Sequence, residues 1–190
     1  INTTPAPPTK TSSNLPMKAV REVVEEYKKG GKAVGHFNIS DSNQMRAIAL
    51  AAKETGLPAI IGLSEGEREY FPLRHARALV SIYQADGVSL YLNADHTYSL
   101  DKAKQAIDDG VDSIVVDGAK LGLEENILLV KQVINYARSS ARDVVVEGEL
   151  GYIGSSSKQL DSLPEGVTVE NLTTVADAKE FVDSTGVDCF

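Results

Sequence analysis

The sequence predicts an α/β fold, and within that class a (β/α)8 TIM barrel of which about the first five and a half strand–helix units lie in this chain. Three observations support this prediction. Short apolar runs alternate with segments of helical periodicity, which is the pattern of a parallel sheet with crossover helices. Each apolar run ends in a polar residue. No glycine-rich nucleotide-binding motif occurs in the sequence.

The first predicted element is a helix over Met17 to Lys29, because Val20, Val23 and Val24 recur at helical spacing before Gly30 and Gly31. The predicted strands follow in chain order as Ala33 to Asn38, Pro58 to Ser64, Val88 to Asp95, Ser113 to Asp117 and Val144 to Glu149, with a sixth beginning at Val187. The predicted helices between them cover about Ser42 to Glu54, Leu73 to Gln84, Leu100 to Asp108, Glu124 to Arg138 and Val175 to Asp183.

Two architectures accommodate this alternation, a doubly wound open sheet and a (β/α)8 barrel, because both use nearly continuous apolar strands joined by right-handed crossovers. The barrel is favoured because polar residues follow nearly every strand, whereas an open sheet concentrates its site where the strand order reverses. Barrels typically have about 250 residues. Because this chain stops inside its sixth strand, we expect it to be truncated.

Composition narrows the function classes. The chain has 190 residues, of which 42% are hydrophobic and 24% charged, with a net charge of −8. This acidity argues against nucleic acid or an anionic membrane surface as a partner. A single cysteine, Cys189, excludes an intrachain disulfide, and no apolar run approaches the roughly 20 residues of a membrane span. We therefore expect a cytoplasmic protein with a flexible arm over residues 1–16 and a barrel domain over residues 17–190.

The pair Asp95-His96 at the end of the third strand is the strongest candidate for chemistry. Imidazole binds zinc and similar cations, and a neighbouring carboxylate can transfer protons. A catalytic zinc usually has three protein ligands. We expect the other two histidines, His36 on a strand and His75 in a helix, to be structural. The alternative for Asp95-His96 is a helix cap or a surface feature.

Asp117 and Glu149 each end an apolar strand, where a carboxylate needs a cation or hydrogen-bond donors to compensate for burial. One interpretation is a cation site, and the other is capping of the following helix. The stretch Gly154 to Lys158 could bind a phosphate or form an ordinary flexible loop. Glu124 and Glu125 are expected to open a helix, where acidic residues favour the helix dipole.

Four ordered motifs together resemble those of class II, metal-dependent fructose-bisphosphate aldolases. The resemblance covers about Met17 to Phe190 and rests on four stretches of the sequence, namely Gly35-His36-Phe37-Asn38, Asn93-Ala94-Asp95-His96, Val116-Asp117-Gly118-Ala119 with Glu124-Glu125-Asn126-Ile127, and Glu147-Gly148-Glu149-Leu150-Gly151.

The resemblance implies a zinc-dependent lyase of glycolysis and gluconeogenesis that reversibly cleaves fructose 1,6-bisphosphate into dihydroxyacetone phosphate and glyceraldehyde 3-phosphate. Zinc, or another divalent cation, would act as the Lewis acid. His96 would be one ligand of this cation, Asp95 the acid/base at the bond being cleaved, and Asp117 with Glu149 would serve a neighbouring cation position. Asn38 and Ser64 would line the substrate. Members of this family are commonly dimers or larger, so we expect a homo-oligomer.

The sequence also departs from the family. The family usually carries an acidic pair after glycines in the loop where this chain has Gly154 followed by three serines, and His36 replaces a commonly small residue. A tagatose-bisphosphate or other ketose-bisphosphate aldolase is therefore an alternative. A non-catalytic barrel that binds sugar phosphates or serves assembly is a second alternative, and another phosphate-binding barrel enzyme without a metal at His96 is a third.

Overall fold

The computed structural model describes residues 17–151 and 172–190. The predictions for the arm at residues 1–16 and for the loop from Gly154 to Lys158 lie outside these residues. Among the helices that are described, none combines the length and the apolar composition that a bilayer crossing requires.

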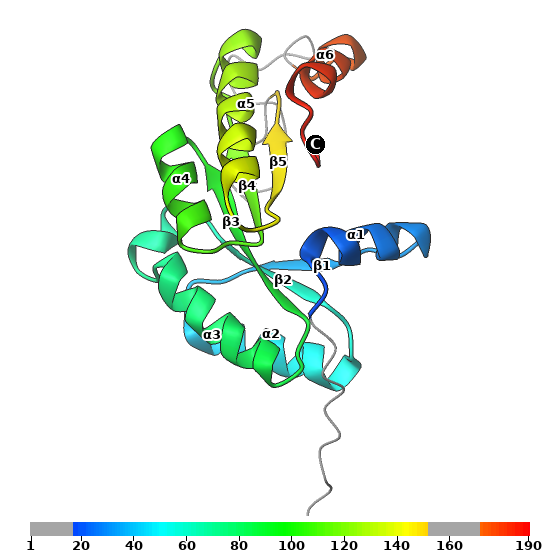
Figure 1. Ribbon diagram of the computed structural model, residues 1–190, viewed down its shortest axis with the longest axis vertical. Helices are drawn as coiled ribbons and strands as arrows, with labels where there is room; N and C mark the ends of the chain where they lie inside the picture. The colour runs from blue at the N-terminus through cyan, green and yellow to red at the C-terminus, as the bar shows by residue number, and fades with distance from the viewer. Residues whose placement is uncertain (1–16, 152–171) are drawn as a thin grey trace, which may run out of the picture.

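Five parallel strands form one sheet whose spatial order is the chain order, β1-β2-β3-β4-β5. The strands are β1 (Gly35–Asn38), β2 (Ala59–Leu63), β3 (Leu90–Thr97), β4 (Ser113–Asp117) and β5 (Val145–Glu149). A doubly wound sheet reverses its strand order at a switch point. Here every crossover advances in the same direction, so the described strands form the consecutive wall of a (β/α) barrel (Figure 1).

Helices follow the strands in strict alternation. They are α1 (Val20–Lys29), α2 (Ser42–Thr55), α3 (Leu73–Ala85), α4 (Leu100–Asp108), α5 (Leu123–Ser139) and α6 (Val175–Thr185), with a short 3₁₀ turn η1 (Glu67–Glu69). Side-chain caps begin several of them: Asp41 accepts from the amides of Asn43 and Gln44 at the start of α2, and Ser99 accepts from the amide of Lys102 at the start of α4.

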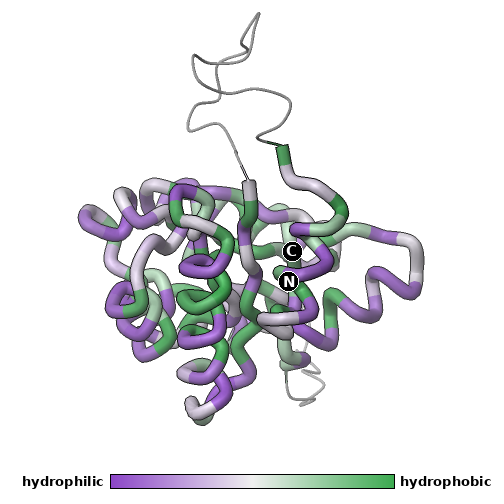
Figure 2. Tube along the Cα trace, turned by 90° about the horizontal axis from the view of Figure 1, so that it is seen from above, coloured by the Kyte–Doolittle hydropathy of each residue, from purple (hydrophilic) through white to green (hydrophobic). Residues whose placement is uncertain are grey.

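The two faces of the sheet bury different residues because side chains alternate along each strand. The outward face packs under the helices, with Ile61, Leu92, Ile114 and Val146 inaccessible to solvent in one hydrophobic core. Figure 2 shows the same layering, with hydrophobic stretches toward the middle of the molecule and hydrophilic stretches on outer helical turns. This core fixes the sheet on which the polar strand ends are displayed.

Helix α1 covers the amino-terminal end of the inward face. Its Val20 and Val23 pack with Tyr91 and Val145 in a second, smaller cluster, and the Tyr91 hydroxyl donates a 3.0 Å hydrogen bond to the carbonyl of Lys18. The inward face is thus apolar at this end, and polar side chains occupy the opposite end.

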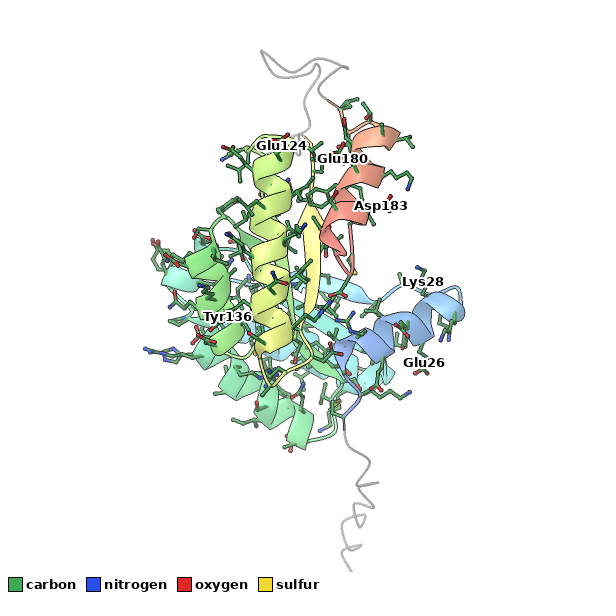
Figure 3. The ribbon with its side chains drawn as sticks, turned by 45° about the horizontal axis from the view of Figure 1, so that its top comes forward. Glu26, Lys28, Glu124, Tyr136, Glu180 and Asp183 are labelled. Carbon is green, nitrogen blue, oxygen red and sulfur yellow. The ribbon has the colours of Figure 1, made fainter. Side chains whose placement is uncertain are left out.

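The acidic start of α5 is confirmed, since Glu124 and Glu125 lie in its first turn. Figure 3 shows Glu124 at that end of the helix and Tyr136 near the other end. The Tyr136 hydroxyl donates to Asp108 of α4 at 2.8 Å, a contact that ties the two neighbouring helices together.

The predicted strand boundaries were correct to within two residues, with one informative error. The third strand was predicted to end at Asp95, with His96 after it, but β3 continues to Thr97, so both residues lie inside the strand. Where a sixth strand was predicted from Val187, the structure has an isolated parallel bridge between Cys189 and Glu147, and the carbonyl of Cys189 accepts from the amide of Gly148 at 3.0 Å.

Candidate metal centre

A β-bulge near the carboxyl end of β3 places Asp95 and His96 in the same site. Ala94 pairs with Ile114 and Thr97 with Val116, so two residues of β3 stand opposite one residue of β4. His96 has φ 40°, in the left-handed region that non-glycine residues rarely adopt. Successive side chains of a regular strand point to opposite faces. The bulge removes this restriction and turns both side chains toward the carboxyl end of the sheet.

The imidazole of His96 lies between two carboxylates from neighbouring strands. Its Nδ1 is 3.0 Å from Oδ2 of Asp117 and 3.2 Å from Oε2 of Glu149. The resemblance to the aldolase family implied one cation position for His96 and a neighbouring one for Asp117 with Glu149. In the structure one ligand atom from each of the three lies within 4.8 Å of the others, so they form a single cluster.

The charges of this cluster shift two pKa values in the same direction. Burial lowers the pKa of His96, but the hydrogen bond with Asp117 and the charges of Asp95 and Glu149 outweigh it, so this pKa is raised. Burial raises the pKa of Glu149, and the charge of Asp117 adds to the effect. The anions gathered here therefore favour the protonated forms of both side chains.

Asp117 does not cap the following helix, because α5 begins after Gly122 without a side-chain cap. Its Oδ1 instead accepts a 3.1 Å hydrogen bond from the amide of Ala119 in the loop after β4. Its Oδ2 faces His96. The bond from Ala119 orients the carboxylate, and its role as a cation ligand stays a prediction.

Asp95 is held by the first strand. The Asn38 side-chain amide donates a 2.7 Å hydrogen bond to Oδ2 of Asp95, while Oδ1 lies 3.9 Å from Nε2 of His96. The strand between them carries Gly62, where a Cβ would lie 2.4 Å from Oδ1 of Asn38 and 2.3 Å from Nε2 of His36. A side chain at position 62 would displace Asn38, so glycine is needed for this approach.

Ser64 directly follows β2. Its hydroxyl accepts a 3.4 Å hydrogen bond from the amide of Glu67 and so begins the turn η1. The role of Ser64 in lining a substrate stays a prediction.

Sequence reasoning missed several residues around the site. His36, expected to be structural, lines a cavity of about 440 Å³ together with Asp95, His96 and Glu149. Glu147 lines the same cavity, and burial raises its pKa. The alternation of β5 was the available signal for Glu147, because it places residues 147 and 149 on one face.

Asn126 is fully buried at the start of α5, and its side-chain amide donates a 2.8 Å hydrogen bond to the carbonyl of Glu149. A Cβ at Gly118 would lie 2.1 Å from Oδ1 of Asn126, so this side chain packs directly against the loop after Asp117. Asn126 thus links the ends of the two strands that carry the carboxylates, a role that the sequence motif alone did not reveal.

The donor set fits a divalent cation. Zinc binds imidazole nitrogen and carboxylate oxygen at about 2.0–2.2 Å, which places neighbouring tetrahedral ligands roughly 3.3 Å apart. The separations of 3.0 and 3.2 Å from His96 Nδ1 to the two carboxylates are close to this value. One imidazole with two carboxylates also suits manganese or iron, so the donors indicate a divalent cation without selecting one.

The fold and the site together define an α/β-barrel protein with a histidine–carboxylate cluster at the carboxyl ends of its strands. The sequence model of class-II fructose-bisphosphate aldolases matches residues 18–190. The chain belongs to this family, as the resemblance of its motifs predicted.

Relatives and solved structures agree. The chain is 34% identical over 179 residues to the fructose-bisphosphate aldolase of Geobacillus stearothermophilus and 31% identical over 176 residues to that of Giardia intestinalis, covering 92% of this chain in each case. It spans 60% and 52% of the lengths of these two proteins.

Among solved structures, the YdjI aldolase of Escherichia coli K12 superimposes with a TM-score of 0.70 at 25% identity, over 89% of this chain and 58% of that one. The fructose-bisphosphate aldolase of Campylobacter jejuni superimposes with a TM-score of 0.68 at 20% identity, over 90% and 54% of the two chains, and supports the fold alone.

Proposed function

We propose that the protein is a metal-dependent class II aldolase that reversibly cleaves fructose 1,6-bisphosphate into dihydroxyacetone phosphate and glyceraldehyde 3-phosphate. The observation that carries the proposal is the cluster of His96, Asp117 and Glu149 with Asp95 beside it. Membership of the family supports the class of reaction. The proposal includes a role in glycolysis and gluconeogenesis, a cytoplasmic location and a homo-oligomeric enzyme.

His96, Asp117 and Glu149 are the proposed ligands of a divalent cation, with zinc as the first candidate. When bound, the cation supplies a Lewis acid that polarises the ketose carbonyl and stabilises the negative charge that develops as the carbon–carbon bond breaks. A catalytic zinc usually takes three protein ligands and keeps one position open, and these three side chains supply that number. A second cation beside the cluster stays a prediction.

Asp95 is the proposed acid/base. The hydrogen bond from Asn38 occupies its Oδ2, which leaves Oδ1 for proton transfer. In cleavage this oxygen takes the proton of the hydroxyl group on the carbon that becomes the aldehyde, and in the reverse direction it returns that proton. Asn38 and Ser64 are proposed to line the substrate, and the hydrogen bond from Asn38 to Asp95 supports this role for Asn38.

The test measures metal content and cleavage of fructose 1,6-bisphosphate in the complete protein, with and without a chelator, for the wild type, His96→Ala and His75→Ala. His75 is the matched control because it is an exposed histidine on α3. We expect His96→Ala alone to lose both metal and activity. Stoichiometric metal without cleavage would favour another ketose bisphosphate, for which tagatose 1,6-bisphosphate is assayed in parallel. A wild type without metal would overturn the proposal in favour of a binding or assembly role.

A further inference from the structure

Arg68, in the turn η1 after β2, reaches across to the bulge of β3. One guanidinium nitrogen, Nη2, lies 2.8 Å from the carbonyl oxygen of Asp95, 3.1 Å from that of His96 and 3.0 Å from Oγ1 of Thr97. These three acceptors belong to the consecutive residues that form and follow the bulge. Arg68 therefore contacts the backbone of both residues that carry the proposed chemistry.

The bulge needs such a donor. The pairing of β3 with β4 is interrupted between Ala94 and Thr97, so the carbonyl groups within the bulge lose their regular ladder partners. Asp95 is buried, and a buried carbonyl without a partner carries a free-energy penalty. The hydroxyl of the completely buried Thr97 needs a partner for the same reason. A planar, permanently charged guanidinium supplies strong donors in a fixed geometry, which an ammonium group does not.

A second contact fixes the same loop to the same strand end. Oε2 of Glu65 accepts a 3.1 Å hydrogen bond from the amide of Tyr98, one residue after Thr97. The turn that carries Arg68 is itself anchored, since the amide of Arg68 donates to the carbonyl of Ser64 at 3.1 Å. Through Arg68 and Glu65, the loop after β2 thus contacts the end of β3 around His96, the residue with the left-handed backbone conformation.

Burial of the Arg68 side chain also carries a free-energy penalty of its own. Its Nε is buried and has no hydrogen-bond partner among residues 17–151 and 172–190. Buried polar atoms are nearly always paired, so an unpaired one calls for an explanation. The contacts of Nη2 supply this explanation, because the guanidinium can donate hydrogen bonds to the bulge only from this buried position.

We infer that Arg68 is the positioning residue that holds the β3 bulge, and through it aims Asp95 and His96 into one site. The part of this inference that concerns metal binding rests on the proposed function. The part that concerns the backbone of the bulge does not, and it is tested separately.

The variants are Arg68→Met, which keeps an unbranched apolar side chain but removes every donor, and Arg68→Lys, which keeps the charge without the planar fork. Arg74→Met is the control, since Arg74 is exposed on α3. Binding of Co²⁺ to the complete protein is followed by its visible absorption spectrum. We expect Arg68→Met to weaken Co²⁺ binding about 10–100-fold and to change the spectrum, because a metal ligand loses affinity when the contacts that orient it are removed. Arg68→Lys should give an intermediate affinity.

Amide hydrogen exchange of the metal-free protein gives the second measurement. Faster exchange at Thr97 and Tyr98 in Arg68→Met, with the control unchanged, would support the inference even if no metal binds, so failure of the proposed function remains distinguishable. The inference would be overturned if these amides exchanged in Arg68→Met at the wild-type rate. It would also be overturned if the wild type binds Co²⁺ and Arg68→Met binds it with the same affinity and spectrum. Arg68→Lys serves the same comparison if Arg68→Met does not fold.

Discussion

Asn38 and Asp95 lie 57 positions apart in the sequence, yet the amide of Asn38 donates a 2.7 Å hydrogen bond to Oδ2 of Asp95. The two residues sit on β1 and β3, and the contact crosses over Gly62 of β2. A carboxylate with one oxygen held in this way presents the other in a defined direction. This contact underlies the first prediction.

Asn38→Ala frees Asp95 to rotate, so we expect kcat for aldol cleavage to fall about 10–100-fold while the metal content stays at the wild-type level. Steady-state kinetics and metal analysis check this. Asn43→Ala is the control, because Asn43 is an exposed asparagine in the first turn of α2. A rise in KM without a fall in kcat would show instead that Asn38 contributes to substrate binding alone.

The raised pKa values of His96 and Glu149 predict that cation binding releases protons and strengthens as pH rises. A bound cation requires neutral imidazole and ionised carboxylate, whereas the metal-free site retains protons above the usual pH range of these groups. Calorimetry in buffers of different ionisation enthalpy, from about pH 5.5 to 8, measures the number of protons released. An affinity that does not change over this range would contradict the prediction.

The raised pKa of His96 also determines how its contribution to the free energy of unfolding changes with pH. The pKa of His96 is raised above its ordinary value of 6.5, so its proton stabilises the metal-free fold. That contribution is fully present below pH 6.5 and is lost as pH rises through the raised folded-state value. We therefore expect the unfolding free energies of wild type and His96→Gln to differ most below pH 6.5. The control variant is His75→Gln, which replaces an exposed histidine of α3.

Gly118 and Asn126 should behave as a coupled pair. A Cβ at Gly118 would lie 2.1 Å from Oδ1 of Asn126, so Gly118→Ala should destabilise the fold by about 1–3 kcal/mol through overpacking. Asn126→Ala should also destabilise it by about 1–3 kcal/mol, because the carbonyl of Glu149 loses its donor. In the Asn126→Ala background the added effect of Gly118→Ala should be much smaller, since Oδ1 and Cγ are gone and only the Cβ of residue 126, 3.1 Å away, remains.

Denaturant unfolding of the two single variants and the double variant checks this coupling. Gly66→Ala is the control, because a Cβ there meets nothing within 4 Å. Additive effects of Gly118→Ala and Asn126→Ala would mean that the two residues do not interact as the structure indicates.

Asp188 connects α1, α5 and β5 through hydrogen bonds. It accepts hydrogen bonds from Arg21 at 2.7 Å, from Arg138 at 2.7 Å and from the amide of Val146 at 2.9 Å. Burial raises the pKa of Asp188, but these donors outweigh it, so the pKa is lowered. Asp188→Ala should reduce the free energy of unfolding by about 1.5–3 kcal/mol at neutral pH.

The pH dependence of that difference is also determined. A lowered pKa gives stability that is present above the ordinary value of 3.8 and lost as pH falls through the folded-state value. Wild type and Asp188→Ala should therefore converge in acid. Asp183→Ala is the control, since its carboxylate is 61% exposed in a surface pair with Lys179 and should change stability by less than about 1 kcal/mol.

The alternation of strands and helices could be predicted because it depends on local periodicity. The strand from Ser113 to Asp117 and the helix from Leu100 to Asp108 were predicted with the bounds that the structure shows. The polar residues that end β4 and β5 could be predicted for the same reason, since a carboxylate after an apolar run is visible without any long-range contact. The order of the four motifs along the chain also predicted the family.

The extent of β3 could not be predicted, because a bulge is a mismatch between two strands and leaves no periodicity in either one. The sequence shows Asp95-His96 only as a polar pair after an apolar run. Pairing with β4 decides that both residues lie inside the strand and that His96 takes a left-handed conformation.

By itself the sequence determined the fold class, the strand ends that carry the chemistry and the candidate residues, because burial alternates with position along the chain. Only the tertiary structure decided which of these residues meet. Strand register gathered Asp117 and Glu149 around His96, and contacts between distant loops brought Arg68 to the bulge. Such contacts depend on separations in space that no local pattern encodes.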